Sequence, residues 1–140
     1  MIRRATEDDI PRINQIRNSV TENRLSSPSL VTPTQLRWFI DNPGIYLWLE
    51  AGTILGFSAA DPRDGSIWAL FMDPAHQGRG IARTLFARAC LVLKETGHKR
   101  IWLMTQPGTR AERFYLAAGW ERAGMKNGQV LFEADIGRVT

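Results

Sequence analysis

Residues 77–82, Gln-Gly-Arg-Gly-Ile-Ala, could bind the phosphates of a ligand through the main chain. An apolar block of strand length precedes them, and apolar residues follow at the three- and four-residue steps of a helix. A turn from strand to helix leaves the first helical N–H groups unpaired at the positive end of the helix dipole. Gly78 and Gly80 lack a Cβ, so a ligand could approach the backbone, and Arg79 and Arg83 add positive charge. This hexad therefore predicts a site for a phosphate-bearing ligand.

Two well-known phosphate-binding motifs do not fit the hexad. A P-loop requires Lys followed by Ser or Thr, and the chain contains no such pair. A Rossmann fingerprint requires glycine or alanine three residues after Gly80, where Arg83 stands. The acidic residue expected about 20 positions further on is replaced by Lys99 and Arg100.

A second stretch, residues 111–120, is typical of a short helix that follows a buried strand. Thr109 is suited to cap this helix and Gly119 to end it. The residues predicted on its core face are Ala111, Phe114, Tyr115 and Ala118, and those predicted on other faces are Arg110 and Arg113.

Both stretches resemble signatures of the GNAT superfamily of N-acyltransferases. Gln77, Gly80 and Ala82 match the acyl-CoA loop pattern Arg/Gln-x-x-Gly-x-Gly/Ala. Residues 111–120 match the second signature, Ala-x-x-Phe-Tyr-x-x-x-Gly-Phe/Trp. Because the two signatures occur in the right order and at a suitable distance, the chain is identified as a member of this superfamily over nearly its whole length.

The elements expected from periodicity follow the order strand, two helices, three strands, helix, strand, helix, two strands. Thr32 and Pro33 are typical of a helix start, and Asn127-Gly128 is typical of a type I′ hairpin turn. The resemblance implies an α/β fold of the GNAT type, with a mixed, mostly antiparallel sheet, splayed fourth and fifth strands and helices on both faces. We expect one domain, 1–140. The predicted ranges are 2–5, 45–50, 54–60, 67–72 and 101–105 for strands, and 9–20 and 109–119 for helices.

The resemblance implies an N-acetyltransferase with acetyl-CoA as co-substrate. The acetyl group would move to a primary amine of a small molecule or peptide by direct attack in a ternary complex. Fourth-strand amides would pair with the pantetheine arm, and the hexad would bind the pyrophosphate. Gly108 stands where many relatives carry an asparagine that contacts the cofactor, which weakens or reroutes one polar contact. The implied cofactor-binding positions are Leu70, Phe71, Met72, Gln77, Gly78, Arg79, Gly80, Ile81, Ala82, Arg83 and Gly108.

Tyr115 is the candidate general acid for the departing thiolate, because a phenol with a pKa of about 10 stays protonated at neutral pH. The alternative is a buried structural tyrosine. Many relatives place a carboxylate base at the position of Ser66, and serine cannot replace it alone. Glu22 is the favoured substitute base, with Glu50 and Asp61 as alternatives, although each also fits a solvated surface charge.

The acceptor amine is expected between the loop with residues 22–24 and the final hairpin with residues 125–129. Trp38, Trp48 and Trp68 could line an aromatic pocket there or could be ordinary core and rim residues. A non-catalytic acyl-CoA sensor on the same fold is an alternative function, supported by the missing fourth-strand carboxylate. An enzyme that acetylates charged tRNA is a third reading, but the dispersed arginines do not favour nucleic acid.

Composition fits a cytoplasmic enzyme with an anionic cofactor. The 140 residues carry a formal net charge of +4 and suffice for one buried core. Cys90 is the single cysteine, which indicates a reducing compartment, and we expect no signal peptide and no membrane span. His76 and His98 lack partners at metal-binding spacing, so we expect no metal. A homodimer is compatible with the sequence.

Overall fold

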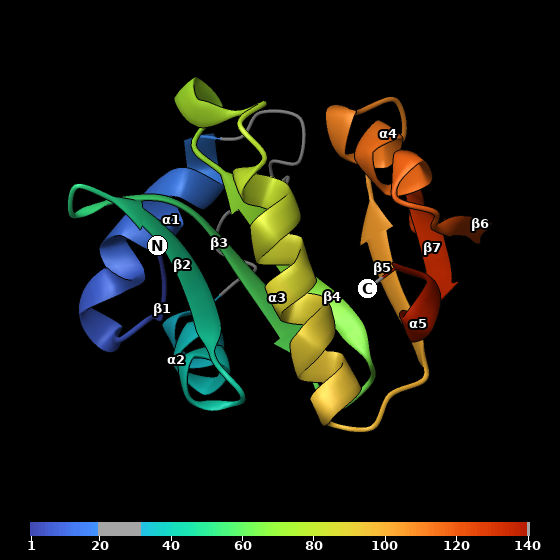
Figure 1. The fold of residues 1–140 in the computed structure, drawn as a ribbon, viewed down its shortest axis with the longest axis horizontal. Helices are drawn as coiled ribbons and strands as arrows, with labels where there is room; N and C mark the ends of the chain where they lie inside the picture. The colour runs from blue at the N-terminus through green and yellow to red at the C-terminus, as the bar shows by residue number, and fades with distance from the viewer. Residues whose placement is uncertain (20–31, 140) are drawn as a thin grey trace.

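One seven-stranded mixed sheet forms the centre of the computed structural model, which describes residues 1–19 and 32–139. The strand order is β1-β2-β3-β4-β5-β7-β6, and β4 and β5 are the parallel pair (Figure 1). The strands are β1 (Ile2–Arg4), β2 (Ile45–Glu50), β3 (Thr53–Asp61), β4 (Ser66–Met72), β5 (Arg100–Thr105), β6 (Glu121–Lys126) and β7 (Gln129–Asp135). The helices are α1 (Ile10–Ser19), α2 (Pro33–Asp41), α3 (Ile81–Glu95), α4 (Arg110–Ala117) and α5 (Ile136–Val139), with the 3₁₀ helices η1 (Glu7–Asp9) and η3 (Pro74–His76).

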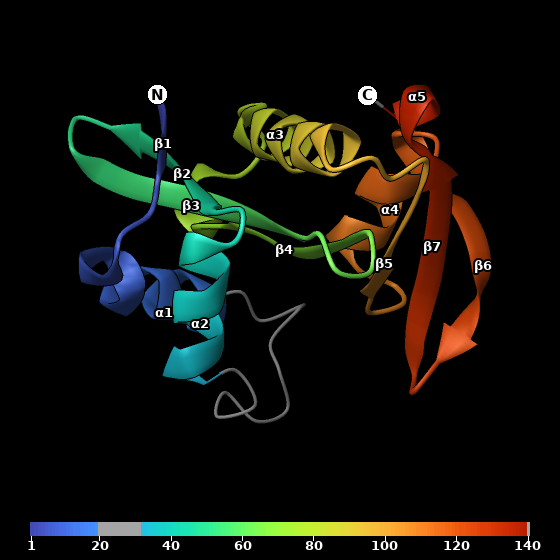
Figure 2. The same ribbon diagram turned by 90° about the horizontal axis from the view of Figure 1, so that it is seen from below.

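Helices cover both faces of this sheet, as Figure 2 shows. On one face α1 packs against β3 and β4, and α2 packs against β2 and β3. On the other face α3 packs mainly against β3, β4 and β2, and α4 shares a core cluster with β5 and β7. The apolar periodicity explains the faces, since Leu85, Ala89 and Leu93 recur at four-residue steps on α3 and are all buried. The predicted mixed α/β fold, with helices on both faces, is confirmed.

Local sequence signals account for several element boundaries. The Thr32 side chain accepts a hydrogen bond from the Gln35 amide, and the Gln35 side chain accepts one from the Thr32 amide, so α2 begins with a capping box. Asn127 and Gly128 have φ values of 52° and 79°, as a type I′ turn between β6 and β7 requires. These predicted boundaries are confirmed.

Two helices differ from prediction. The helix expected over 9–20 begins earlier, as the 3₁₀ turn Glu7–Asp9, and its described part ends at Ser19. The Asp9 carboxylate accepts hydrogen bonds from the Thr6 amide and the Arg3 guanidinium, which stabilises this earlier start. α5 was not predicted, because four residues are too few to show a periodic pattern.

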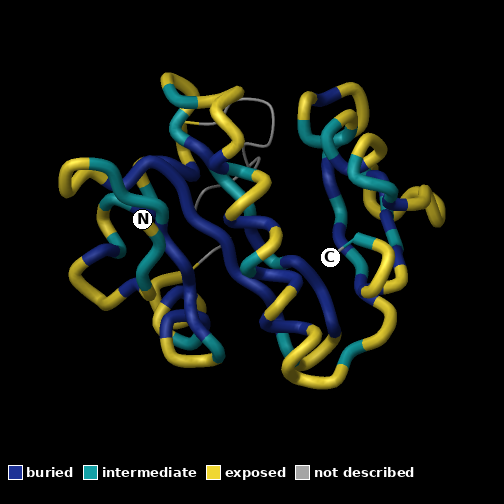
Figure 3. Tube along the Cα trace, viewed as in Figure 1, coloured by how far each residue is buried: buried dark blue, intermediate teal, exposed yellow. Residues whose placement is uncertain are grey.

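The contact between β4 and β5 is confined to their first residues. Ser66 lies opposite Trp102, and the Trp102 amide donates to the Gly65 carbonyl oxygen at 3.2 Å. Beyond this contact the two strands diverge toward their carboxyl ends (Figure 1). β3 is buried along nearly its whole length, whereas the loop of residues 77–80 that follows the far end of β4 is exposed (Figure 3).

Candidate active site

A cavity of about 360 Å³ lies at the carboxyl end of β4, between the loop before α3 and helix α4. Its lining comes from β4, from η3 and the loop after it, from the first turn of α3 and from α4: Leu70, Phe71, Met72, His76, Gln77, Gly78, Gly80, Ile81, Ala82, Arg83, Arg110, Ala111, Phe114 and Tyr115. Nine predicted cofactor positions lie among them. Arg79 and Gly108, also predicted there, do not line the cavity.

The start of α3 is open to an anion. Gly80 is its N-cap residue, with φ 79°, and no side chain caps the helix. The first turn of α3 also carries no acidic residue. By contrast, the start of α4 has a side-chain cap, because the Thr109 hydroxyl accepts a hydrogen bond from the Glu112 amide. A Cβ built on Gly78 or Gly80 would meet no atom within 4 Å, so the space beside both glycines is empty. The unpaired N–H groups and the helix dipole therefore face the cavity without a side-chain anion.

The geometry of β4 directs two amides toward the gap beside β5. The Asp73 amide donates to the Leu55 carbonyl oxygen at 2.8 Å, which fixes the alternation of the antiparallel β3–β4 ladder. By this alternation the N–H of Phe71 points toward β3, whereas those of Leu70 and Met72 point toward β5. The register gives β4 and β5 a single pair, at Ser66, in the part of the chain that the structure describes. The amides of Leu70 and Met72 are thus directed into the gap.

Two cations line the cavity, and they differ from those expected. Arg83 lies in the first turn of α3 as predicted, and Arg110 is the first residue of α4. Arg110 is exposed, as expected for a residue off the core face of α4, and it also borders the cavity.

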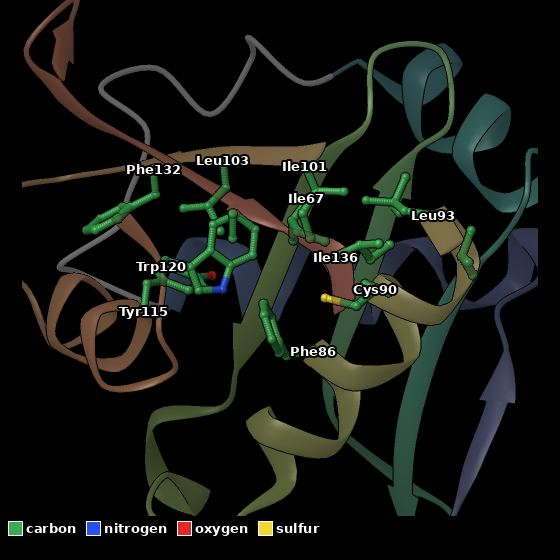
Figure 4. Packing of buried hydrophobic residues seen from close by; sticks show 14 of the residues in the cluster. Ile67, Phe86, Cys90, Leu93, Ile101, Leu103, Tyr115, Trp120, Phe132 and Ile136 are labelled. Carbon is green, nitrogen blue, oxygen red and sulfur yellow. The ribbon is translucent and has the colours of Figure 1, made fainter. Parts of the chain in front are cut away.

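Tyr115 lines the cavity and is 6% exposed. Its ring contacts the rings of Phe86, Phe114, Trp120 and Phe132 at centroid distances between 5.3 and 6.0 Å. Figure 4 shows it among Phe86, Trp120 and Phe132. Burial, together with the Cys90 thiol, raises the pKa of the Tyr115 hydroxyl. The hydroxyl is therefore protonated at neutral pH, as a general acid must be, and it is also packed as a core residue would be.

The described carboxylates proposed as bases are already engaged in ion pairs. Glu50 accepts from Arg79 at 2.6 Å, and the Arg79 guanidinium lowers the pKa of Glu50. Asp61 accepts from Arg63 through both oxygens, at 2.9 Å each, and although burial opposes ionisation these hydrogen bonds lower its pKa. Ser66 lies at the opposite end of β4 from the cavity and donates to Asp64 Oδ1 at 2.7 Å. Glu22 lies outside the described residues.

The three tryptophans do not form one pocket. Trp38 and Trp68 both pack on Phe39 on the α1 and α2 side, with Trp68 stacked at 3.8 Å between centroids. Trp48 packs on the other face, against the buried cluster of Leu55, Met72, Ile81 and Leu85. The interpretation as a shared aromatic pocket was wrong, and the alternative of core and rim residues fits the structure. Strict alternation from Met72 would place Trp68 on the face of Trp48, but the register shift opposite Ala59 and Ala60 leaves Trp68 without a partner on β3 and turns it to the other face.

No cluster of three or more potential metal ligands occurs in residues 1–19 and 32–139. His98 does not line the cavity, and its Nε2 lies 2.8 Å from the Pro62 carbonyl oxygen. Within the same described ranges, no helix is long and apolar enough to span a bilayer.

Sequence reasoning missed four lining residues as ligand contacts: His76, Arg110, Ala111 and Phe114. Because the sequence predicts Ala111 and Phe114 on the same helix face as Tyr115, this shared face is a signal that both residues border the same site. His76 lies one residue before the hexad, so proximity in sequence could have included it.

The chain is similar to known acetyltransferases. A family model described as the acetyltransferase (GNAT) family matches residues 10–120. A curated relative, the mycothiol acetyltransferase of Sanguibacter keddieii, is 34% identical over 113 residues, which cover 73% of this chain and 35% of that protein. The chain thus spans about a third of the length of this relative.

Solved structures share the fold at lower identity. An N-acetyltransferase from Staphylococcus aureus Mu50 superposes with a TM-score of 0.76 at 20% identity, covering 97% of this chain and 98% of that one. The PaiA N-acetyltransferase of Thermoplasma acidophilum, in complex with coenzyme A, gives 0.79 at 14%, covering 96% and 98%. YncA of Salmonella typhimurium, with its cofactor acetyl-CoA, gives 0.75 at 17%, covering 97% and 93%. Since the family model matches residues 10–120, which are most of the chain, the chain belongs to the GNAT family of acetyltransferases.

Proposed function

We propose that the chain transfers the acetyl group of acetyl-CoA to a primary amine of a small molecule or a peptide. One observation carries this proposal: the uncapped start of α3, the gap-facing amides of β4 and Tyr115 all border the same cavity. The coenzyme A and acetyl-CoA in the PaiA and YncA structures support the choice of ligand.

The residues present fit such a ligand in two parts. The amides of the Gln77–Ala82 hexad, with Arg83, would hold the pyrophosphate, because this end of α3 carries no anion of its own. The N–H groups of Leu70 and Met72 would hold the pantetheine arm, since both point into the gap. The cavity of about 360 Å³ lies within the range of small-molecule sites, about 300–1,000 Å³.

Acetyl-CoA would supply a thioester carbonyl that a neutral amine can attack directly. The amine nitrogen forms a bond to the carbonyl carbon, the carbon–sulfur bond breaks, the nitrogen loses a proton and the sulfur gains one. Backbone amides stabilise the charge that develops on the carbonyl oxygen, and such donors contribute roughly 3–4 kcal/mol each. In this proposal Tyr115 protonates the sulfur, for which its raised pKa keeps the proton available.

Glu22 is the base in this proposal, because the other candidates are held by arginines. Glu50 and Asp61 have lowered pKa values and direct ion pairs, which makes each a weak proton acceptor. An acceptor amine that arrives neutral would need no base. Replacing Glu22 by Gln separates the two cases. If Glu22 is the base, turnover of the variant should fall, and most at low pH. If the amine arrives neutral, turnover should not change.

Thermal unfolding with acetyl-CoA, desulfo-CoA and ATP tests the ligand. Acetyl-CoA at 100 times its Kd should stabilise the fold by about 2.7 kcal/mol and raise the Tm by several degrees. Acetyl transfer is then tested by measuring the release of the coenzyme A thiol with each amine of a panel. Absence of any Tm shift at millimolar acetyl-CoA would overturn the proposal, and binding without turnover across the panel would favour an acyl-CoA sensor.

A further inference from the structure

Arg79 lies between the two glycines of the hexad, and its side chain is turned toward protein groups. Gly78 and Gly80 have φ values of 83° and 79°. Glycine adopts positive and negative φ about equally well, so these residues by themselves do not hold the loop in one conformation. The Arg79 guanidinium donates to Glu50 Oε1 at 2.6 Å and to His76 Nδ1 at 3.2 Å. Arg79 does not line the cavity.

Glu50 is a fixed anchor for this contact. It is the last residue of β2 and pairs with Thr53 across the β2–β3 hairpin, 29 residues before Arg79 in the chain. The ion pair therefore joins the middle of the loop to the sheet. Its side chains are 39% and 46% exposed, so the contact is accessible to solvent and salt.

The other end of the same connection is also held. Arg12 of α1 donates to Asp73 Oδ2 at 2.9 Å, and Asp73 Oδ1 accepts from the Ala75 amide at 3.0 Å. The segment from β4 to α3 is thus tied to α1 at its start and to β2 near its end. Between these ties lie three residues that line the cavity, His76, Gln77 and Gly78.

We propose that Glu50 is a positioning residue for cofactor binding, which holds Arg79 and thereby fixes the amides of residues 77–80 for a pyrophosphate. Arg79 then acts as a tether and does not contact the phosphates. This inference rests on the proposed function, because the anion it serves is that of acetyl-CoA.

The two roles of Arg79 predict opposite signs for one substitution. Glu50→Gln removes a negative charge near an anion site and releases Arg79. If Arg79 were a phosphate ligand, or if charge alone mattered, coenzyme A would bind more tightly. If Glu50 positions the loop, coenzyme A binds more weakly, because the amides must be ordered on binding.

The experiment is calorimetric titration of the full chain with coenzyme A, for the unchanged protein, Glu50→Gln, Arg79→Gln and the double variant. We expect Kd to rise roughly two- to fivefold in each single variant, the range that exposed ion pairs allow, and no further in the double variant. Glu7→Gln is the control, because Glu7 forms a comparable surface ion pair with Arg37 at 3.3 Å and does not line the cavity. Tighter or unchanged binding by Glu50→Gln overturns the inference.

A second readout needs no ligand. Backbone ¹⁵N order parameters of residues 77–80 should fall in Glu50→Gln and stay unchanged in Glu7→Gln. Equal order parameters in Glu50→Gln and the unchanged protein overturn the tether. If the unchanged protein does not bind coenzyme A, the proposed function fails, and the order parameters alone decide whether Glu50 holds the loop.

Discussion

Ser66 of β4 lies opposite Trp102 of β5, and the register contains no other pair between these strands among the described residues. β4 continues from Ser66 to Met72, so its far end has β3 on one side and the gap on the other. Pairing at one end and divergence at the other leave main-chain donors for a ligand while the sheet remains continuous.

Hydrogen exchange should show this alternation directly. In the free protein we expect the amides of Leu70 and Met72 to exchange faster than that of Phe71, because only the last is bonded within the β3–β4 ladder. Acetyl-CoA should slow Leu70 and Met72 and leave Phe71 unchanged. Residue-resolved exchange by NMR measures all three, and equal protection of the three amides in the free protein would contradict the assigned ladder.

Gly80→Ala should abolish most cofactor affinity at a modest cost in stability. The φ of 79° costs a residue with a Cβ about 1–2 kcal/mol, so the backbone would shift away from the conformation that presents the first amides of α3. Gly97→Ala is a matched control, because Gly97 has a φ of 91°, an equally open environment and a position after the other end of α3. Calorimetric titration with coenzyme A and thermal unfolding separate the effects. A similar loss of affinity in both variants would assign the effect to strain in α3.

The sequence was sufficient for features that depend on neighbouring residues. The periodicity of α3, the capping box at Thr32 and the positive-φ turn at Asn127 are local, and each lies where its pattern predicted. Most of the cavity lining also follows, because strand end, glycine loop and helix start are consecutive in the chain.

Features that depend on distant residues could not be predicted. Arg79 was expected at a phosphate, but the β2–β3 hairpin brings Glu50 within 2.6 Å of it, and no local pattern encodes that contact. The separation of β4 and β5 came from family resemblance alone, since apolar strands such as 67–72 and 101–105 give no sign of where pairing stops. Tertiary contacts thus decided the direction of side chains that local patterns had left open.

Tyr115→Phe should lower turnover while coenzyme A affinity stays within about twofold. Loss of a general acid costs typically 10²–10⁴-fold in rate, and the ring that packs on Phe86 and Trp120 is retained. Tyr46→Phe is the control, because it also removes a hydroxyl from a buried ring, one that accepts from Arg88 at 3.2 Å. Steady-state rates and calorimetric titration provide the comparison. Full turnover by Tyr115→Phe would make the residue purely structural.

Alkaline pH should destabilise the protein through Cys90. Burial raises the pKa of this thiol from 9.0 to about 12, so the folded protein keeps a proton that the unfolded chain releases. The corresponding stability is complete below pH 9 and is lost as the pH rises toward 12. Denaturant unfolding at pH 8 and pH 10.5 should show a loss that is smaller in Cys90→Ala by about 1–2 kcal/mol. The same loss in both proteins would contradict the shift.

Asp61→Asn should reduce stability and leave the pH dependence of turnover unchanged. Hydrogen bonds from Arg63 outweigh burial and lower the pKa of Asp61, so its contribution to stability is present above the unfolded pKa of about 3.8 and is lost as the pH falls through the lower folded value. Removing the charge at pH 7 should cost about 1–2 kcal/mol, in line with a charged hydrogen bond. Asp135→Asn is the control, because Asp135 is exposed and bonds Arg100 at the surface, where replacements change stability by about 0.5 kcal/mol or less. Calorimetry and the pH profile of kcat/KM test both claims. If Asp61→Asn leaves the Tm unchanged and kcat/KM of the variant no longer falls at acidic pH, Asp61 would instead be the catalytic base.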